Sequence, residues 1–349
     1  MDNLYYQEFR DIDINDPFFD SLKQTYTEFS FWFARKANEK AYVLYADSRI
    51  VGFMYLKVEQ GPIHDIHPQI STKLALKIGT FKFENIGTRR GQRFLKKAID
   101  NALFSNVDTI YVTMFEEQKK LMGMIQRYGF QIHGRKNTAN GTEVVLTKFM
   151  NSSTGSSIQT YPFISLSNKQ YLMLSIYPEH HTKLFPDSIL KNENEDIVQD
   201  VSHTNSIHKI YMTKMDAVNR LNPGDLILIY RTTDNLGPAE YRSVVTSLCV
   251  FQSIRHIDTF ESYDEYYDYC SSYSVFTDEE LLDIWNTRKY PFIIKFMYNA
   301  ALTKRLTKAQ LVANVGLSRG DYWGYRRLTL EQIRTVIYLG GVNESLIVN

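Results

Sequence analysis

The sequence predicts a mixed α/β protein that is built from two folded units. The chain has 349 residues, about twice the length of a typical domain. Residues 74–130 alternate apolar runs with helix-patterned stretches, in the order strand, loop, helix, strand, helix. Residues 151–159 are rich in serine, asparagine and glycine, which is the composition of a linker. We therefore expect a first domain over residues 1–150, a linker over 151–160 and a second domain over 161–349.

The first domain is expected to be an α/β unit around a central sheet. Asp16 followed by Pro17 predicts a helix start, because aspartate caps the first turn and proline fits the first helical position. Apolar residues at helical spacing carry this helix to Phe33. The predicted strands cover residues 4–10, 41–45, 50–58 and 74–83, and a last pair separated by residues 137–141 ends at residue 149.

A glycine- and arginine-rich turn follows the strand at 74–83. Gly87 and Gly91 lack a Cβ atom, so the backbone between them turns sharply and presents several N–H groups toward one point. The helix that starts near Gly91 adds its positive end, so an anion such as a pyrophosphate is the expected ligand. An ordinary strand-to-helix connection is the alternative. The residues predicted to hold the phosphates are Gly87, Thr88, Arg89, Arg90, Gly91 and Gln92.

Residues 1–149 resemble the acetyl-CoA-binding region of the GNAT N-acetyltransferases. The family signature after the fourth strand is Arg or Gln, then Gly-x-Gly-x-Gly; here Ile86, Gly87, Arg89 and Gly91 occupy those positions. A later family helix ends in Leu-Tyr-x-x-x-Gly-Phe, and this chain keeps the final pair at residues 129–130. Ile125 stands where the family often has the tyrosine that protonates the leaving thiolate.

The resemblance implies an acetyl-CoA site and an acceptor site. In the family a backbone N–H polarises the thioester carbonyl where two strands separate, which points to Thr80, Phe81, Lys82 and Phe83. Acetyl transfer also needs a base for the acceptor amine and a proton for the thiolate. The candidate bases are Glu59, His64, Asp65 and His67, at the end of a strand and in the loop after it. Exposed loop histidines without a role are the alternative, and no metal site is predicted because the loop lacks a fourth ligand.

The second domain is expected to contain strands, a tight turn and two closing helices. Asn222 to Asp225 form the turn, which follows a short helix at 215–221 and leads into a strand at 226–231. Other strands are predicted at 172–177, 210–213, 243–254 and 292–298. This order resembles PUA-like folds, the group that includes the ASCH and EVE domains. The resemblance implies a small β-barrel with helices, and a groove that binds RNA or modified bases.

Charge is unevenly distributed over the second domain. Residues 257–284 carry nine acidic and no basic side chains, whereas residues 285–334 carry ten basic and two acidic ones, a net charge of +8. A basic surface with aromatic side chains suits phosphate contacts and base stacking. The predicted nucleic-acid contacts are Arg319, Tyr322, Trp323, Arg326 and Arg327. Two alternatives remain: the acidic and basic segments pack on each other, or residues 311–318 belong to a helix-turn-helix.

Composition excludes several classes of protein. The formal net charge of +1 leaves no whole-chain attraction to nucleic acids or membranes. Two cysteines are too few for a disulfide scaffold. Asp11, Asp13, Asp16 and Asp20 argue against a secretory signal, and no apolar run approaches the 18 residues of a membrane span. We expect a cytoplasmic protein.

Two functional hypotheses follow. The first is an acetyl-CoA-dependent N-acetyltransferase whose PUA-like domain selects an amine acceptor linked to RNA or tRNA. The second is a binding protein with weak or no catalysis, in which an acyl-CoA module accompanies a domain that binds RNA or a modified base. Strand-turn-helix order and the Gly-Phe pair favour the enzyme, whereas the partial glycine motif and Ile125 favour the binding protein.

Overall fold

The computed structural model describes residues 2–84, 90–151, 154–185 and 206–348. Its contacts divide the chain into two compact units, with a boundary between Thr160 and Tyr161. Each unit combines sheet and helices, so the mixed α/β class is confirmed. None of the helices in the described ranges has the length and apolar character that crossing a membrane requires.

Unit 1 is organised around a seven-stranded sheet with the order β1-β2-β3-β4-β5-β7-β6. Neighbouring strands are antiparallel except for β4 and β5, which run parallel. The predicted strand at 74–83 is confirmed to the residue, and it lies in the middle of the sheet. The strands are β1 (Asp2–Glu8), β2 (Lys40–Ala46), β3 (Arg49–Gln60), β4 (Leu74–Phe83), β5 (Thr109–Met114), β6 (Gln131–Thr138) and β7 (Gly141–Phe149).

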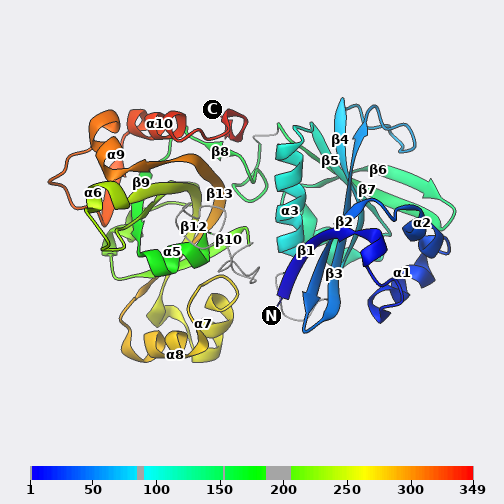
Figure 1. Ribbon diagram of the computed structural model, residues 1–349, viewed down its shortest axis with the longest axis horizontal. Helices are drawn as coiled ribbons and strands as arrows, with labels where there is room; N and C mark the ends of the chain where they lie inside the picture. The colour runs from blue at the N-terminus through cyan, green and yellow to red at the C-terminus, as the bar shows by residue number, and fades with distance from the viewer. Residues whose placement is uncertain (1, 85–89, 152–153, 186–205, 349) are drawn as a thin grey trace. The chain divides into compact units, whose positions relative to one another are not determined.

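Helices cover the two faces of this sheet, as Figure 1 shows. Gly52 of β3 lies directly under Phe94 of α3 (Arg90–Phe104), where a Cβ atom would come within 2.4 Å of the phenyl ring. The next residue, Phe53, points to the other face and packs with the aromatic core of α1 (Asp20–Thr25) and α2 (Phe29–Arg35). Alternation along β3 therefore assigns α3 and the α1–α2 pair to opposite faces. The remaining helix of the unit is α4 (Lys119–Arg127).

The single helix expected after Asp16 is broken into pieces. The Asp16 carboxylate accepts a hydrogen bond from the Phe18 N–H at 2.8 Å, as predicted for a cap, but the turn that it caps is a 3-10 turn, Pro17–Phe19. The helix that follows, α1, ends at Thr25, and Tyr26 has an extended backbone with φ −120° and ψ 101°. With this break the Tyr26 side chain packs at the edge of the aromatic core and its hydroxyl reaches β7, where it donates to Glu143.

Unit 2 contains a six-stranded sheet with the order β10-β13-β12-β11-β9-β14. Within the described ranges the edge strands β10 and β14 are not paired with each other, so the expected closed barrel is not confirmed. A separate pair joins β8 and β15 in parallel. The strands are β8 (Ile164–Ser165), β9 (Tyr171–Ile176), β10 (His208–Thr213), β11 (Leu226–Arg231), β12 (Val244–His256), β13 (Phe292–Thr307), β14 (Tyr325–Leu328) and β15 (Ile347–Val348).

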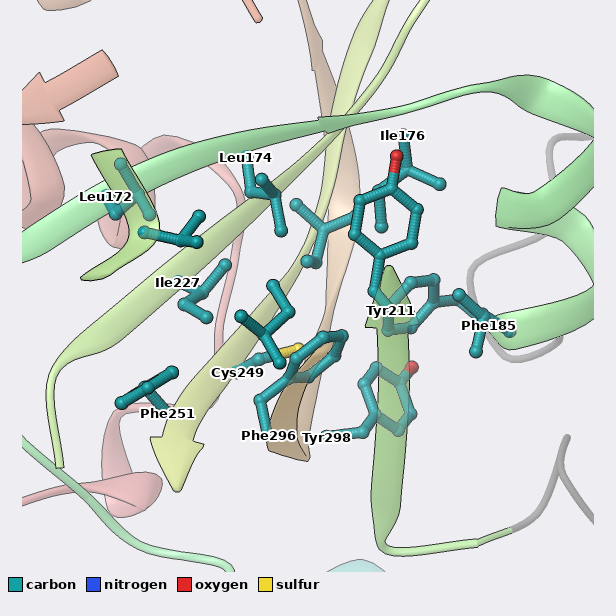
Figure 2. Packing of buried hydrophobic residues seen from close by; sticks show 14 of the residues in the cluster. Leu172, Leu174, Ile176, Phe185, Tyr211, Ile227, Cys249, Phe251, Phe296 and Tyr298 are labelled. Carbon is teal, nitrogen blue, oxygen red and sulfur yellow. The ribbon is translucent and has the colours of Figure 1, made fainter. Parts of the chain in front are cut away.

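One hydrophobic cluster of unit 2 packs on the face of this sheet that Tyr211 and Ile294 share, and another packs on the face of Ile210 and Ile293. Figure 2 shows Phe296 and Tyr298 of β13 beside Cys249 of β12, with Phe185 packed against them. The Phe185 ring centroid lies 5.5 Å from that of Tyr298 and 6.2 Å from that of Phe296. Both cysteines, Cys249 and Cys270, are reduced and buried, and burial raises the pKa of the Cys270 thiol to about 12. Neither thiol is therefore suited to act as a nucleophile.

Four of the described helices of unit 2 begin at a serine or threonine whose side chain caps the first turn. Thr307 and Thr329 form capping boxes with Gln310 and Gln332, which start α9 (Lys308–Val315) and α10 (Leu330–Leu339). Gly316 ends α9 in the left-handed conformation, and the chain then forms β14 rather than a second helix. The helix-turn-helix alternative is therefore wrong. The other helices are α5 (Pro178–Leu184), α6 (Ala239–Arg242), α7 (Tyr263–Cys270) and α8 (Asp278–Thr287).

Candidate active site

The two parallel strands of unit 1 separate partway along their length. Residues 75–78 of β4 pair with residues 109–112 of β5, and the pairing then stops. At the same point the register with β3 shifts: Leu56 faces Ile78 and Tyr55 faces Thr80, which leaves Gly79 as an extra residue. Such a bulge increases the local twist of a strand. Residues 79–83 therefore continue beside β3 alone, and a gap opens between β4 and β5.

Backbone alternation shows which N–H groups face this gap. The Glu84 N–H donates to the Val51 carbonyl of β3 at 2.8 Å. Since successive residues of a strand direct their N–H groups to opposite edges, Phe81 and Phe83 direct theirs away from β3 and into the gap. Two of the predicted backbone donors are thus placed where a carbonyl oxygen could accept a hydrogen bond.

Lys82 differs from its two neighbours. Alternation directs its N–H toward β3, and its ammonium donates to the Phe18 carbonyl and to Ser21 Oγ. Lys82 therefore holds β4 against the α1 side of the unit and does not face the gap, contrary to its prediction as a cofactor contact.

A pocket of about 230 Å³ lies beside the gap on the α1–α2 face. Its walls come from α1, α2, β4, β5, the start of α4 and the β6–β7 hairpin. Apolar walls alternate with charged and amide groups, which is the usual character of a small-molecule site. The lining residues are Leu22, Tyr26, Glu28, Phe29, Trp32, Lys77, Ile78, Gly79, Thr80, Phe81, Val112, Thr113, Met114, Gln118, Leu121, Lys136, Thr138, Asn140 and Glu143.

Glu143 is the buried carboxylate of this pocket. Glu143 is only 5% exposed, and its Oε1 accepts a hydrogen bond from the Tyr26 hydroxyl at 3.0 Å. Burial and the neighbouring carboxylate raise the pKa of Tyr26, so the phenol keeps its proton and remains the donor. The Tyr26 ring stacks on Phe115 with centroids 5.6 Å apart, which fixes its orientation. Glu143 retains further acceptor positions for a cationic ligand.

Two lysines contribute positive charge to the same pocket. The Lys136 ammonium forms an ion pair with Asp65. Among the described residues the Lys77 ammonium forms no hydrogen bond or ion pair, and it lies 5.7 Å from the centroid of the Tyr111 ring. Burial first, and then the nearby Lys136 ammonium, lower the pKa of Lys77. Lys77 is therefore a half-buried cation without a counter-ion in direct contact.

Glu59 does not line this pocket. Its Oε2 accepts from the Tyr111 hydroxyl, and its Oε1 accepts from Lys57 Nζ at 2.9 Å. Burial raises the pKa of Glu59, but the hydrogen bonds from Tyr111 and Lys57 outweigh it and lower the pKa overall. With both oxygens bonded and a depressed pKa, Glu59 is a poor proton acceptor, and the structure gives it a stabilising role instead of the predicted catalytic one.

The loop residues predicted as bases are exposed and also lie outside the pocket. His64 Nδ1 is 3.0 Å from Gln69 Oε1, and Asp65 is bonded to Lys136. His67 exchanges backbone hydrogen bonds of 2.9 Å with Arg135 of β6. The loop is anchored by the buried residues Ile63, Ile66 and Ile70, so its polar side chains point outward. Asp65 alone is connected to the pocket, through Lys136.

Half of the predicted phosphate turn is described. Gly87, Thr88 and Arg89 lie outside the described residues, whereas Arg90, Gly91 and Gln92 form the buried first turn of α3.

Gly91 has a packing role there. A Cβ atom at Gly91 would come within 2.5 Å of Phe83 Cζ and 2.7 Å of Met124 Sδ. This glycine therefore lets α3 approach β4 and α4 closely, whatever it contributes to phosphate binding. Ile125 has no ionisable proton, and the Tyr128 residue is fully buried, so neither offers a proton to a ligand.

The predicted nucleic-acid contacts of unit 2 lie around β14 but differ in their availability. Arg319 donates two hydrogen bonds to Glu240, at 2.9 and 2.7 Å, and Arg326 pairs with Asp321 at 2.6 Å. Arg327 is exposed and forms no ion pair with a described residue. Local carboxylates thus neutralise two of the three arginines.

The two predicted aromatic contacts also differ in their exposure. Tyr322 is 71% exposed. The Trp323 ring lies 5.4 Å from the ring of Tyr230 and is covered by the Lys308 ammonium at 4.6 Å. The alternative that the basic and acidic segments pair gains some support, because Arg288 contacts Asp258 and Lys289 contacts Asp283.

Glu143, Tyr26, Lys77 and Lys136 are not among the residues predicted from the sequence. One signal for Glu143 was present: it alternates with Val145 and Thr147 on a strand, so it shares their buried face. The other three residues could be assigned to the pocket only from the tertiary structure. Tyr26 faces the pocket because of the helix break, and the two lysines lie on strands whose partners are distant in sequence.

Comparisons with known proteins give structural neighbours. No family model matches the sequence, and no curated protein matches it. The NatC complex bound to Gag peptide and CoA is similar at 17% identity and TM-score 0.30, covering 42% of this chain and 98% of that one. A GNAT family acetyltransferase from Elizabethkingia anophelis with acetyl-CoA bound has 14% identity and TM-score 0.31, covering 42% and 97%. An ASCH mutant protein from Zymomonas mobilis has 11% identity and TM-score 0.31, covering 49% and 97%.

Two of these structures hold CoA or acetyl-CoA. All three TM-scores lie below 0.5, so the site geometry and not these likenesses must carry a functional conclusion.

Proposed function

We propose that unit 1 is an acetyl-CoA-dependent acyltransferase that acetylates an amine bound in the pocket. One observation carries the proposal: β4 bulges at Gly79 where it leaves β5, so the Phe81 N–H is directed into a gap beside a pocket with a buried carboxylate. A backbone donor fixed in this way stabilises the negative charge that develops on a carbonyl oxygen. The sequence resemblance to the GNAT family selects acetyl-CoA as the donor.

The chain's own residues have distinct roles in this reaction. Acetyl-CoA, when bound, supplies an acetyl thioester. The Phe81 N–H hydrogen-bonds the carbonyl oxygen, and Glu143 binds the acceptor ammonium and accepts the proton that exposes its lone pair. The C–N bond forms and the C–S bond breaks, and the second proton of the acceptor nitrogen leaves with the thiolate sulfur. Ile125 takes no part in this proton transfer because its side chain is a hydrocarbon, and Tyr128 takes none because it is fully buried.

The described residues around the gap between β4 and β5 fit acetyl-CoA. The gap is continuous with the pocket, because Gly79, Phe81, Thr113 and Met114 line both. Phe83 packs on Gly91 at the start of α3, which brings the helix N-terminus next to the gap. Residues 85–89, which the sequence predicts to hold the pyrophosphate, lie outside the described ranges.

A binding protein without catalysis is the second candidate, and the buried Ile125 favours it. Full-length protein incubated with acetyl-CoA and pools of amines, including total tRNA, separates the candidates by release of CoA thiol. Amine-dependent release supports the acyltransferase. Calorimetric binding of acetyl-CoA without release from any pool supports the binding protein. Absence of binding overturns both.

We also propose that unit 2 binds RNA. Arg327 and Tyr322 are the predicted contacts that remain exposed without a carboxylate partner among the described residues. If they contact RNA, Arg327→Ala should weaken filter binding and reduce its salt dependence, since each phosphate contact releases counter-ions. Arg319→Ala, which removes an arginine already paired with Glu240, should have a smaller effect. Equal effects, or no RNA retention at low salt, would argue against this surface.

A further inference from the structure

Lys77 is a charged group of the pocket that the proposed reaction does not use. It lies on β4, its side chain lines the pocket, and its ammonium has neither an ion pair nor a hydrogen bond with a described residue. The Tyr111 ring and the more distant carboxylates of Glu59 and Asp65 stabilise this ammonium in part, but they do not replace the hydrogen bonds to water that burial removes, so a ligand that accepts a hydrogen bond is favoured here. The second lysine of the pocket, Lys136, already has Asp65.

The strand registers place Lys77 and Glu143 at different levels of the pocket. Lys77 pairs with Tyr111, at the part of β5 that still contacts β4. Glu143 lies one residue beyond the pair of Met114 and Val144, and is therefore level with Phe115 at the open end. Four residues of strand separate these levels, roughly 13 Å between backbone positions. The cation thus lies at the closed end, and the carboxylate lies where the gap opens.

We propose that the acceptor is an amine that also carries a carboxylate several bonds away, with its carboxylate held by Lys77 and its amine by Glu143. This inference rests on the proposed function for the role of the amine, but the binding that it describes does not depend on acetyl-CoA. The same pocket has apolar lining residues, Leu22 and Phe29, which suit the methylene groups that join the two charges. A charge-assisted hydrogen bond from Lys77 would then discriminate a carboxylate from a neutral amide.

The test uses full-length protein and two pairs of probes. We would measure the dissociation constants of 4-aminobutyrate and 6-aminohexanoate, and of the carboxamide of each, by calorimetry or by saturation-transfer NMR. We expect at least one acid to bind at least about tenfold more tightly than its amide. Lys77→Met should bring that ratio close to one, whereas Lys77→Arg should restore most of it.

Lys73→Met is the matched control, because Lys73 is an exposed lysine just before β4 and does not line the pocket. It should keep the wild-type ratio, and thermal unfolding should show that all variants are folded. The inference is overturned by equal binding of acids and amides, by a ratio that survives in Lys77→Met, or by the absence of saturable binding of every probe. Titration of acetyl-CoA into the same samples reports on the proposed function separately, because its failure leaves the acid-to-amide ratio measurable.

Discussion

At the scale of single residues, Glu143 carries the chemistry of the pocket. Glu143→Gln keeps the shape of the side chain and its acceptor for Tyr26, but removes the charge that attracts an ammonium and accepts its proton. We expect amine-dependent thiol release to fall by about 10²- to 10⁴-fold, the usual contribution of a positioned acid or base. Acetyl-CoA affinity, measured by calorimetry, should be unchanged.

Glu116→Gln is the control for this variant, because Glu116 is an exposed carboxylate that contacts Arg135 and lies outside the pocket lining. It should retain wild-type turnover. A Glu143→Gln protein with undiminished turnover would remove Glu143 from the reaction.

Glu59 is expected to affect stability and its dependence on pH. The folded-state pKa of Glu59 lies below its ordinary value of 4.5, so its contribution is fully present above that value and is lost as the pH falls through the folded pKa. Glu59→Gln should lower the free energy of unfolding at pH 7 by roughly 1 to 3 kcal/mol, because the buried Tyr111 hydroxyl loses a charged acceptor. It should also flatten the decline of stability in acid. Urea unfolding at a series of pH values measures both effects, and an unchanged acid slope would contradict this role.

At the scale of elements, Gly91 sets the distance between α3 and β4. Gly91→Ala places a methyl group within 2.5 Å of Phe83 and 2.7 Å of Met124, so we expect overpacking to cost about 1 to 3 kcal/mol of unfolding free energy. Gly123→Ala in α4 is the matched control, because nothing lies within 4 Å of its added Cβ. It should stabilise the protein by about 0.5 to 1 kcal/mol through helix propensity. Chemical denaturation measures both variants. A shift of the unfolding free energy in the same direction for both would contradict the packing role of Gly91.

Elements with a strong local pattern were predictable, and those that depend on distant partners were not. The run that forms β11 gave its position closely, because burial of every residue leaves a continuous apolar signal. The bulge at Gly79 arises from the register between β3 and β4, which no single segment specifies. The break at Tyr26 was also hidden, because Leu22, Tyr26, Phe29 and Phe33 keep helical spacing across it. Glu59 has a typical position for a base, and only its contacts with Tyr111 and Lys57 exclude that role.

At the scale of the whole molecule, the end of unit 1 includes part of the predicted linker. The buried Lys148 ammonium donates to the Tyr128 carbonyl at 2.9 Å and to the Gln159 carbonyl at 2.7 Å. Gly129 packs directly on the same Gln159 carbonyl, where a Cβ would come within 2.1 Å. A fragment of residues 1–160 should therefore be more stable than one of residues 1–150, by roughly 1 to 3 kcal/mol for the lost acceptor of a charged donor. Equal unfolding midpoints for the two fragments would place the boundary at residue 150.

The central claim is that the acetyl group of acetyl-CoA is held by the backbone of β4 where it leaves β5. Full-length protein labelled with ¹⁵N at phenylalanine, titrated with acetyl-CoA, tests this directly, because Phe81 and Phe83 direct their N–H groups into the gap. We predict that the amide resonances of Phe81 and Phe83 shift with saturation, and that the amide of Phe296, in the core of unit 2, does not. Saturable binding that leaves the Phe81 and Phe83 resonances unmoved, or the absence of any shift on titration, would contradict the claim.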